Sequence, residues 1–378
     1  MTAAFDIVKG ADIGAGVAGH IGRIPVRNLW LLMLYASDLF RMGGIGKVGL
    51  EDNEDDLPDL VGEILARAVE IRQRRHLSFG YRSRDAVLNR VRGRINMLNT
   101  ERHQLLARGL VACRFDELTI DTPRNRFVRA ALESISRVVS RKRKDVAGRC
   151  RSLALGMKVM GVSGNAPTRT EMSSDRFGRH DADDRFMVAA AKLALDLALP
   201  NETAGENVLA LPDREVTWVR RLFERAVGGF YDVVLTPKGW LVRCGRTLDW
   251  KIEQKTDGIE KILPTMRTDI MLDDPPSGRR IVIDTKFTSI VTSGWYREET
   301  LRSGYIYQIY AYLRSQVGCG DSIADRASGL LLHPSINDAV DETVVIQGHS
   351  IRFATLDLTG TATEIRTQLL RIAEPILH

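Results

Sequence analysis

Apolar positions in the first half of the chain recur mainly with the period of an α-helix. Between residues 57 and 75 they are spaced three and four apart, as on one helix face: Leu57, Leu60, Val61, Ile64, Leu65, Ala68 and Ile71. Residues 30–36 are apolar throughout, a run that suits a buried helix and is too short to cross a membrane. Residues 123–139, which begin with proline, and 186–199 predict two more helices. The first half is therefore expected to be rich in helices.

The second half mixes helical patterns with short β-branched runs. Helices are predicted at 215–231, 305–316 and 362–373. Strands are predicted at 240–243, 329–333 and 349–358, and on both sides of a polar turn at 273–278. Helices interleaved with strands in this way indicate a mixed α/β (α+β) fold with a central sheet flanked by helices.

Length and composition suggest two domains. The 378 residues exceed a typical single domain, and residues 200–205 form the best candidate linker. The first 22 residues are rich in Gly and Ala, and the G-x-G-x-x-G at 14–19 lacks the following helix that a dinucleotide site needs. We therefore expect a flexible leader at 1–22, a helix-rich domain at 23–205 and a mixed α/β domain at 206–378.

The charge and cysteine content narrow the class of protein. A net charge of +6 suggests a polyanionic partner. Seven Lys or Arg and one Asp lie between residues 137 and 151, either as a solvated helix face or as a contact for phosphates or an acidic partner. The four scattered cysteines and the absence of a long apolar run favour a cytoplasmic protein with no membrane span.

The strands around the turn at 273–278 carry the candidate chemistry. If these six residues close a plain hairpin, Leu272 faces Arg279 and Asp269 faces Val282. Asp284 and Lys286 then share the face of Asp269, and the two aspartates are diagonal neighbours roughly 7–8 Å apart. Burying such charges is unfavourable unless they are paired or bind a cation.

Two interpretations of this cluster remain open. Asp269, Asp284 and the backbone carbonyl of Thr285 would suit Mg²⁺, a hard cation that prefers oxygen ligands and could stabilise charge on a phosphate. Lys286 would then orient or deprotonate an attacking water. Alternatively, the cluster is an ion pair that only holds the hairpin together. Two similar pairs, Asp249-x-Lys251 and Glu253-x-Lys255, lie in a polar segment and are expected to be exposed.

The D…D-x-K arrangement resembles the core of the PD-(D/E)xK nucleases, although the proline of that motif is missing before Asp269. Gln308 and Tyr312 match the Q-x-x-x-Y element of RecB-like members and lie one helical turn apart. Further fragments occur in the same order as in the McrC family, the nuclease subunit of modified-cytosine-specific restriction systems. They include Ile24-Pro25-Val26-Arg27-Asn28, Gly93-Arg94-Ile95, Phe115-Asp116-Glu117-Leu118, Pro264-x-Met266-x-Thr268-Asp269-Ile270, Ile283-Asp284-Thr285-Lys286-Phe287 and Gly329-Leu330-Leu331-Leu332-His333-Pro334.

This resemblance implies a function in two parts. Residues 206–378 would form a restriction-endonuclease-like domain that cleaves DNA containing modified cytosine. Residues 23–205 would dock on an McrB-like AAA+ GTPase hexamer and stimulate it. Asp269 and Asp284 would be Mg²⁺ ligands, Lys286 the catalytic lysine, Gln308 and Tyr312 supporting residues, and Glu224 an additional acidic group.

Two alternatives differ from this function. One is a non-catalytic adaptor that binds DNA and activates the GTPase. The other is a nuclease that acts alone or with an unrelated motor. The sequence has no Walker A loop, so any NTP-driven step must come from another chain.

Overall fold

The computed structural model describes residues 20–21, 24–42, 57–178, 181–203, 212–288, 290–293, 299–335 and 339–374. The chain divides into two compact units, one of Pro58–Leu199 and one that joins Met1–Leu57 to Pro200–His378. Most of the predicted leader at 1–22 lies outside the described residues, which begin with β1 (His20–Ile21) paired with β2 (Ile24–Pro25).

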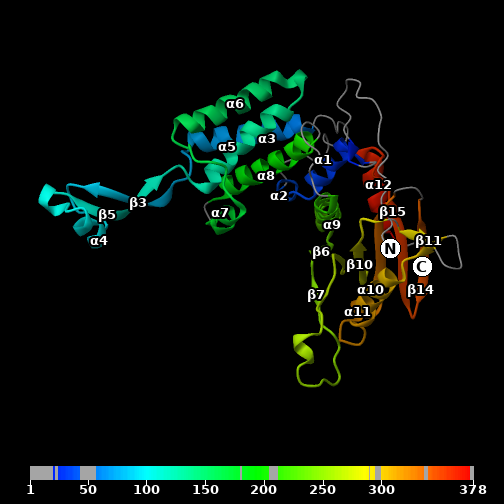
Figure 1. Cartoon of the computed structure of the whole chain (residues 1–378). Coiled ribbons are helices and arrows are strands. Elements are labelled where there is room, and N and C mark those ends of the chain that lie inside the picture. Colours follow the sequence, from blue (N-terminus) through cyan, green and yellow to red (C-terminus); the bar gives the residue numbers. More distant parts are fainter. Residues whose placement is uncertain are drawn as a thin grey trace. The chain divides into compact units, whose positions relative to one another are not determined.

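The first unit is built mainly of helices (Figure 1). Its helices are α3 (Leu57–Arg74), α4 (Met97–Arg102), α5 (Pro123–Val138), α6 (Lys144–Val159), α7 (Arg169–Ser174) and α8 (Ala182–Thr203). The side chain of Thr122 caps α5 by accepting a hydrogen bond from the backbone N–H of Asn125. Most of the apolar stripe predicted for α3 is buried, with Val61 and Leu65 fully so, but its last member, Ile71, is exposed. The helix-rich character expected of this half is confirmed.

A β-ribbon in the same unit was largely missed from the sequence. β3 (Gly80–Leu88) pairs antiparallel with β5 (Val111–Thr119), and the short β4 (Arg94–Ile95) pairs with the other edge of β5. Most side chains of β3 are exposed, so the strand has no buried face and no apolar alternation to reveal it. Cross-strand ion pairs between Arg84 and Glu117 and between Asp85 and Arg114 lie along the ribbon instead.

The second unit contains a mixed six-stranded sheet in the order β14-β15-β13-β10-β9-β6. The strands of this sheet are β6 (Leu241–Cys244), β9 (Ile270–Asp274), β10 (Arg279–Thr285), β13 (Ser328–Pro334), β14 (Asp341–Ile346) and β15 (His349–Leu356). β13 runs parallel to both β10 and β15, and the other pairs are antiparallel. Short two-stranded pairs accompany it: β7 (Thr247–Leu248) with β8 (Met266–Arg267), and β11 (Val291–Ser293) with β12 (Glu299–Leu301).

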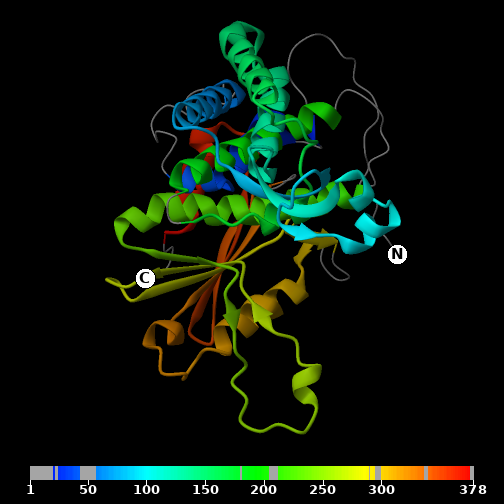
Figure 2. The same ribbon diagram turned by 90° about the vertical axis from the view of Figure 1, so that its left-hand side faces the viewer.

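Helices flank this sheet, as the mixed α/β prediction expected. Those that contact its strands are α9 (Pro212–Leu235), α10 (Ser303–Arg314), α11 (Ser322–Asp325) and α12 (Ala362–Ile372), while α1 (Val26–Tyr35) and α2 (Asp38–Arg41) pack against α9. Figure 2 shows α10, in orange, running beside the yellow to red strands. Ile309, Tyr312 and Leu313 of α10 pack in one core with Met271 of β9 and Val282 of β10. α10 therefore covers the sheet face on which these two strand residues lie.

The two units differ from the predicted domains at the N-terminal end. Residues 24–41 were expected to open the helix-rich domain, yet α1 and α2 pack against α9 in the second unit. The side chain of Asn28 donates hydrogen bonds to the carbonyls of Leu358 (2.6 Å) and Gly360 (2.9 Å). The apolar run at 29–36 is buried in that unit, a long-range contact that linear composition could not reveal. α8 also continues to Thr203, so most of the predicted linker at 200–205 is helical.

The register of the β9–β10 hairpin also differs from the prediction. Ile281 pairs with Leu272 and Arg279 with Asp274, so the turn has four residues, Pro275 to Gly278, and not six. Asp273 lies inside β9 because it accepts buried hydrogen bonds from Arg280 (2.6 and 3.0 Å). The two-residue shift preserves which side chains share a face, since the faces alternate with a period of two.

Gly229 permits the close approach of α9 to α1. A Cβ atom at this position would lie 1.9 Å from the carbonyl oxygen of Tyr35. We expect Gly229→Ala to lower the free energy of unfolding by about 1–3 kcal/mol, since the backbone of α1 must move. Gly304→Ala is the control, because a Cβ atom there meets no atom within 4 Å. Equal urea midpoints for Gly229→Ala and the unmodified protein would contradict this packing.

Candidate active site

The candidate site lies where β9 begins and β10 ends. Asp269 immediately precedes β9, Asp284 lies near the end of β10, and Lys286 follows that strand. Continuing the hairpin register by one pair beyond Ile270 and Ile283 places Asp269 directly opposite Asp284. Directly opposed residues share a sheet face and are closer than the diagonal neighbours expected from the sequence.

Asp269 is held at this position by its neighbours. Its Oδ2 accepts hydrogen bonds from the backbone N–H (2.7 Å) and the hydroxyl (2.8 Å) of Thr285. Its backbone carbonyl accepts a hydrogen bond from the N–H of Gly245 (2.8 Å). These contacts fix the carboxylate of Asp269 against the end of β10, and they account for the threonine between Asp284 and Lys286.

Asp284 and Lys286 form a buried ion pair. Their side chains are 1% and 8% exposed. The ammonium nitrogen lies 2.9 Å from Oδ2 of Asp284, but the geometry of a hydrogen bond is met only at Oδ1, at 3.1 Å. Oδ2 is thus a buried carboxylate oxygen that accepts no hydrogen bond from the described residues. An oxygen in this condition is available to a ligand.

Burial dominates the electrostatics of Asp284. It raises the pKa of this carboxyl to about 6, against the opposing effect of the Lys286 ammonium and with a further contribution from the negative charge of Asp269. The proton of Asp284 is therefore held more tightly than that of an ordinary aspartate. A cation bound beside it would favour the ionised form.

Glu224 of α9 shares this acidic environment. Burial raises the pKa of Glu224, and the charges of Asp269 and Asp284 raise it further. Arg267 and Arg220 oppose this increase. Sequence reasoning did not single out these two arginines, although Arg267 precedes Asp269 by two residues and Arg220 lies one helical turn before Glu224.

α10 brings two further predicted residues to the site. The side-chain amide of Gln308 donates a hydrogen bond to the hydroxyl of Tyr312 (2.6 Å), as their spacing of one turn allows. Tyr312 is buried, and its pKa is raised by that burial and by the nearby charges of Asp284 and Asp269. Gln308 is thus bonded to a tyrosine on which the charges of both carboxylates act.

The donor set fits a hard divalent cation. Two opposed carboxylates, one of them with a buried oxygen that lacks a hydrogen bond, are oxygen ligands of the kind that Mg²⁺ prefers. No group of three or more His, Cys, Asp or Glu side chains with metal-site geometry occurs in the described ranges. Within the described residues, Glu224 therefore does not complete a three-carboxylate group with Asp269 and Asp284.

The two other carboxylate–lysine pairs of the sequence are unsuited to binding a divalent cation. Asp249, Lys251, Glu253 and Lys255 are all exposed, in the segment between β7 and β8. Their predicted exposure is confirmed.

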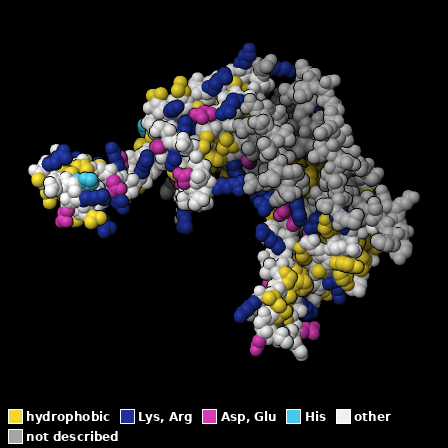
Figure 3. All heavy atoms as spheres, in the orientation of Figure 1, with side chains coloured by type: hydrophobic (Ala, Val, Ile, Leu, Met, Phe, Trp, Pro, Cys, Tyr) yellow, Lys and Arg dark blue, Asp and Glu magenta, His cyan; other side chains and the backbone are white. Residues whose placement is uncertain are grey.

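The basic stretch at 137–151 is partly committed to ion pairs within the helical unit. Arg143 contacts Glu63 (3.0 Å) and Asp145 (3.3 Å), and Arg149 contacts Glu70 (2.5 Å). Figure 3 shows that Lys and Arg side chains around α6 are interspersed with hydrophobic and acidic ones. Lys142 and Lys144, the exposed lysines of the basic stretch, are available for the predicted contact with DNA or a partner.

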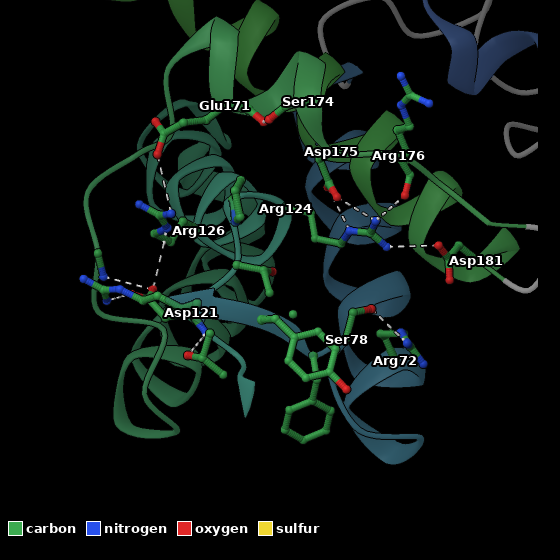
Figure 4. Close-up of a pocket in the computed structure, with 18 residues that line it drawn as sticks. Arg72, Ser78, Asp121, Arg124, Arg126, Glu171, Ser174, Asp175, Arg176 and Asp181 are labelled. Carbon is green, nitrogen blue, oxygen red and sulfur yellow. Dashed lines mark hydrogen bonds and ion pairs between the residues drawn. The ribbon is translucent and has the colours of Figure 1, made fainter. Parts of the chain in front are cut away.

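A cavity of about 950 Å³ lies in the helical unit, where the β-ribbon joins the helices (Figure 4). Arg124 crosses it to Asp175 (2.8 Å), and its Nη1 contacts both Asp181 (3.4 Å) and the buried Asp184 (2.8 Å). None of the predicted site residues lines this cavity. Its lining carries five arginines and four carboxylates, and the carboxylates of the hairpin remain the candidate site.

Fold and site together define a mixed α/β protein with an acidic, lysine-containing centre at the end of its main sheet. The chain matches the model of a family described as McrBC 5-methylcytosine restriction system component over residues 12–323. It belongs to that family, and the resemblance seen in the sequence is confirmed.

Two similar proteins can be compared with the chain. It is 25% identical over 356 residues to the type IV methyl-directed restriction enzyme EcoKMcrBC of Escherichia coli (strain K12), covering 94% of this chain and 98% of that relative. A chain from the half-complex of the Thermococcus gammatolerans McrB AAA+ hexamers with bound McrC aligns with a TM-score of 0.41 and 15% identity, over 92% of this chain and 76% of that one. Among the helices that the structure describes, none has the length and apolar character to cross a membrane.

The raised pKa of Asp284 predicts how this residue affects stability in metal-free buffer. The native carboxyl binds its proton more tightly than the unfolded one, so its contribution is fully present below about pH 4. That contribution is lost as the pH rises through about 6. The change amounts to about 3 kcal/mol at most, at 1.36 kcal/mol per pH unit.

Urea unfolding of the unmodified protein and Asp284→Asn between pH 4 and pH 7, with EDTA, isolates this contribution. The unmodified protein should lose stability relative to the variant across this interval. A difference between the two proteins that does not change with pH would contradict the raised pKa.

Proposed function

We propose that this protein is the Mg²⁺-dependent DNA endonuclease subunit of a modified-cytosine-dependent restriction system. The observation that carries the proposal is the position of Asp269 opposite Asp284, with the ammonium of Lys286 2.9 Å from the second carboxylate. A buried ion pair alone would not require the second aspartate, nor leave a buried carboxylate oxygen without a hydrogen bond.

Each residue has a role in the proposed hydrolysis of a phosphodiester bond. Asp269, Asp284 and the backbone carbonyl of Thr285 would hold Mg²⁺. The ion, when bound, would polarise the phosphate and stabilise the charge that develops on it. Lys286 would orient or deprotonate the attacking water, or stabilise the transition state by its charge. Glu224 is assigned as an additional acidic group of the site.

The surroundings of the carboxylates support binding of a polyanion. Arg267 and Arg220 bring positive charge to the acidic group, as their effects on Glu224 indicate. Both side chains are exposed, so they can meet phosphates of a DNA backbone. Gln308 and Tyr312 would support the site from α10, where their mutual hydrogen bond fixes both side chains.

The proposed partner is an McrB-like AAA+ GTPase hexamer, which the helical unit would dock on and stimulate. Membership of a family of restriction system components supports a multi-protein assembly. The similarity to a methyl-directed restriction enzyme over nearly the whole chain supports modified DNA as the substrate. The chain's own sequence has no Walker A loop, so GTP hydrolysis would be the partner's reaction.

Asp284→Ala tests the nuclease assignment. We expect it to abolish Mg²⁺-dependent cleavage of methylated plasmid in the presence of the AAA+ partner and GTP, since the metal loses a carboxylate ligand. Partner binding and stimulation of GTP hydrolysis should persist, because the site lies outside the helical unit.

Asp249→Ala is the matched control, because Asp249 belongs to an exposed Asp-x-Lys pair of the same unit and should leave cleavage unchanged. Full cleavage by Asp284→Ala would refute the assignment. An unmodified protein that stimulates the GTPase but never cuts DNA would point to the adaptor function instead.

The exposed lysines of the basic stretch give a second test. Removing both, as Lys142→Ala with Lys144→Ala, should weaken binding to DNA or partner. If they contact DNA, the slope of log K against log salt should fall by about 2. Lys158→Ala, an exposed lysine at the far end of α6, is the control. A loss of binding that is the same at every salt concentration would contradict an electrostatic contact.

A further inference from the structure

The ammonium of Lys286 lies between a carboxylate and an aromatic ring. On one side it approaches Asp284, at 2.9 Å from Oδ2. It also lies over the ring of Tyr305, 5.3 Å from the ring centroid. A cation at this distance from an aromatic face is attracted by the quadrupole of the ring, most strongly where water is excluded. With its side chain only 8% exposed, Lys286 meets that condition.

Tyr305 is itself fixed by residues from two other segments. It lies in the first turn of α10, and its ring centroid is 5.7 Å from that of His333 in β13. Its hydroxyl lies 3.5 Å from the hydroxyl of Thr288, two residues after Lys286. The ring therefore contacts both the strand beside Lys286 and the segment that follows it.

His333 anchors this arrangement. Its Nδ1 lies 2.8 Å from the carbonyl of Thr288, and because a carbonyl only accepts, Nδ1 carries the hydrogen. The imidazole is almost completely buried, and this burial lowers the pKa of His333 to about 4. His333 is therefore neutral near pH 7 and can pack beside Tyr305 without adding a second positive charge next to Lys286.

The backbone holds the same segments together. The N–H of Lys286 donates to the carbonyl of Leu332 (2.9 Å), which extends the parallel pairing of β10 with β13 by one residue. Leu332 directly precedes His333, so the lysine and the histidine are fixed on adjacent strands. The end of β10, the end of β13 and the start of α10 therefore meet around the side chain of Lys286.

We propose that Tyr305 is a positioning residue, which holds the ammonium of Lys286 against Asp284 for phosphodiester hydrolysis. The inference rests on the proposed nuclease function. A lysine side chain has four rotatable bonds, and holding it in one conformation is opposed by the loss of rotamer entropy. The ring offers a second contact for the ammonium, so fewer conformations turn it away from the carboxylate.

Tyr305→Leu removes the aromatic face and keeps an apolar side chain. We expect it to lower the single-turnover rate of DNA cleavage by roughly tenfold, the effect of losing a buried cation–π contact. DNA affinity in Ca²⁺ and stimulation of the partner's GTPase should change little. Tyr305→Phe, which retains the ring, should restore most of the rate.

Tyr310→Leu is the matched control on α10. Tyr310 packs on the same core as Tyr305, but its hydroxyl bonds Gln347. It should reproduce any general loss of stability without the loss of rate. Equal rates for Tyr305→Leu and the unmodified protein would overturn the inference, as would an equal loss in Tyr310→Leu.

A spectroscopic measurement tests the contact without any cleavage. With lysines labelled at Cε, the resonance absent from Lys286→Arg identifies Lys286. The ring current of residue 305 should shift the resonances of the Lys286 Cε protons upfield in the unmodified protein and in Tyr305→Phe, but not in Tyr305→Leu. An undisplaced resonance in the unmodified protein would refute the contact. Displacement in a protein that never cuts DNA would refute the proposed function, and with it the role of Tyr305 in hydrolysis.

Discussion

The candidate site depends on one constraint, the burial of the Asp284 carboxylate and the Lys286 ammonium together at the end of a sheet strand. Removing two such charges from water is unfavourable unless nearby groups compensate each of them. The positive charge of Lys286 is compensated by the carboxylate of Asp284 and by the ring of Tyr305. The negative charge of Asp284 is compensated only in part. Burial raises the pKa of its carboxyl, and its Oδ2 accepts no hydrogen bond from the described residues. The remaining deficit is what a divalent cation between Asp284 and Asp269 would relieve.

Several other features of the second unit follow from this constraint. The two aspartates oppose each other only in the observed hairpin register, which the ion pair of Asp273 with Arg280 favours. Thr285 fixes the carboxylate of Asp269. α10 covers the same face of the sheet, where its Tyr305 contacts Lys286 and the charges of both carboxylates act on its Tyr312. The sheet thus positions the charged side chains, and α10 packs beside them.

The sequence predicts the parts of the site that depend on local patterns. Alternation of side chains placed Asp269, Asp284 and Lys286 on one face, and helical spacing placed Gln308 beside Tyr312. Other features were not predicted, each for its own physical reason. The hairpin register shifts because Asp273 pairs with Arg280 inside the strands, and β3 has no buried face to reveal it. The packing of α1 on α9 joins residues about 200 positions apart. Likewise, nothing in the local sequence of His333 indicates that it approaches Tyr305.

The central claim is that Asp269 and Asp284 share one divalent cation, and anomalous diffraction from crystals soaked in Mn²⁺ tests it most directly. Mn²⁺ favours the same oxygen ligands as Mg²⁺ and scatters anomalously. The account predicts a peak at about 2.1–2.2 Å from an oxygen of each carboxylate, lost in Asp284→Ala. No peak at the hairpin, or a peak that persists in that variant, would contradict it and leave the cluster as a structural ion pair.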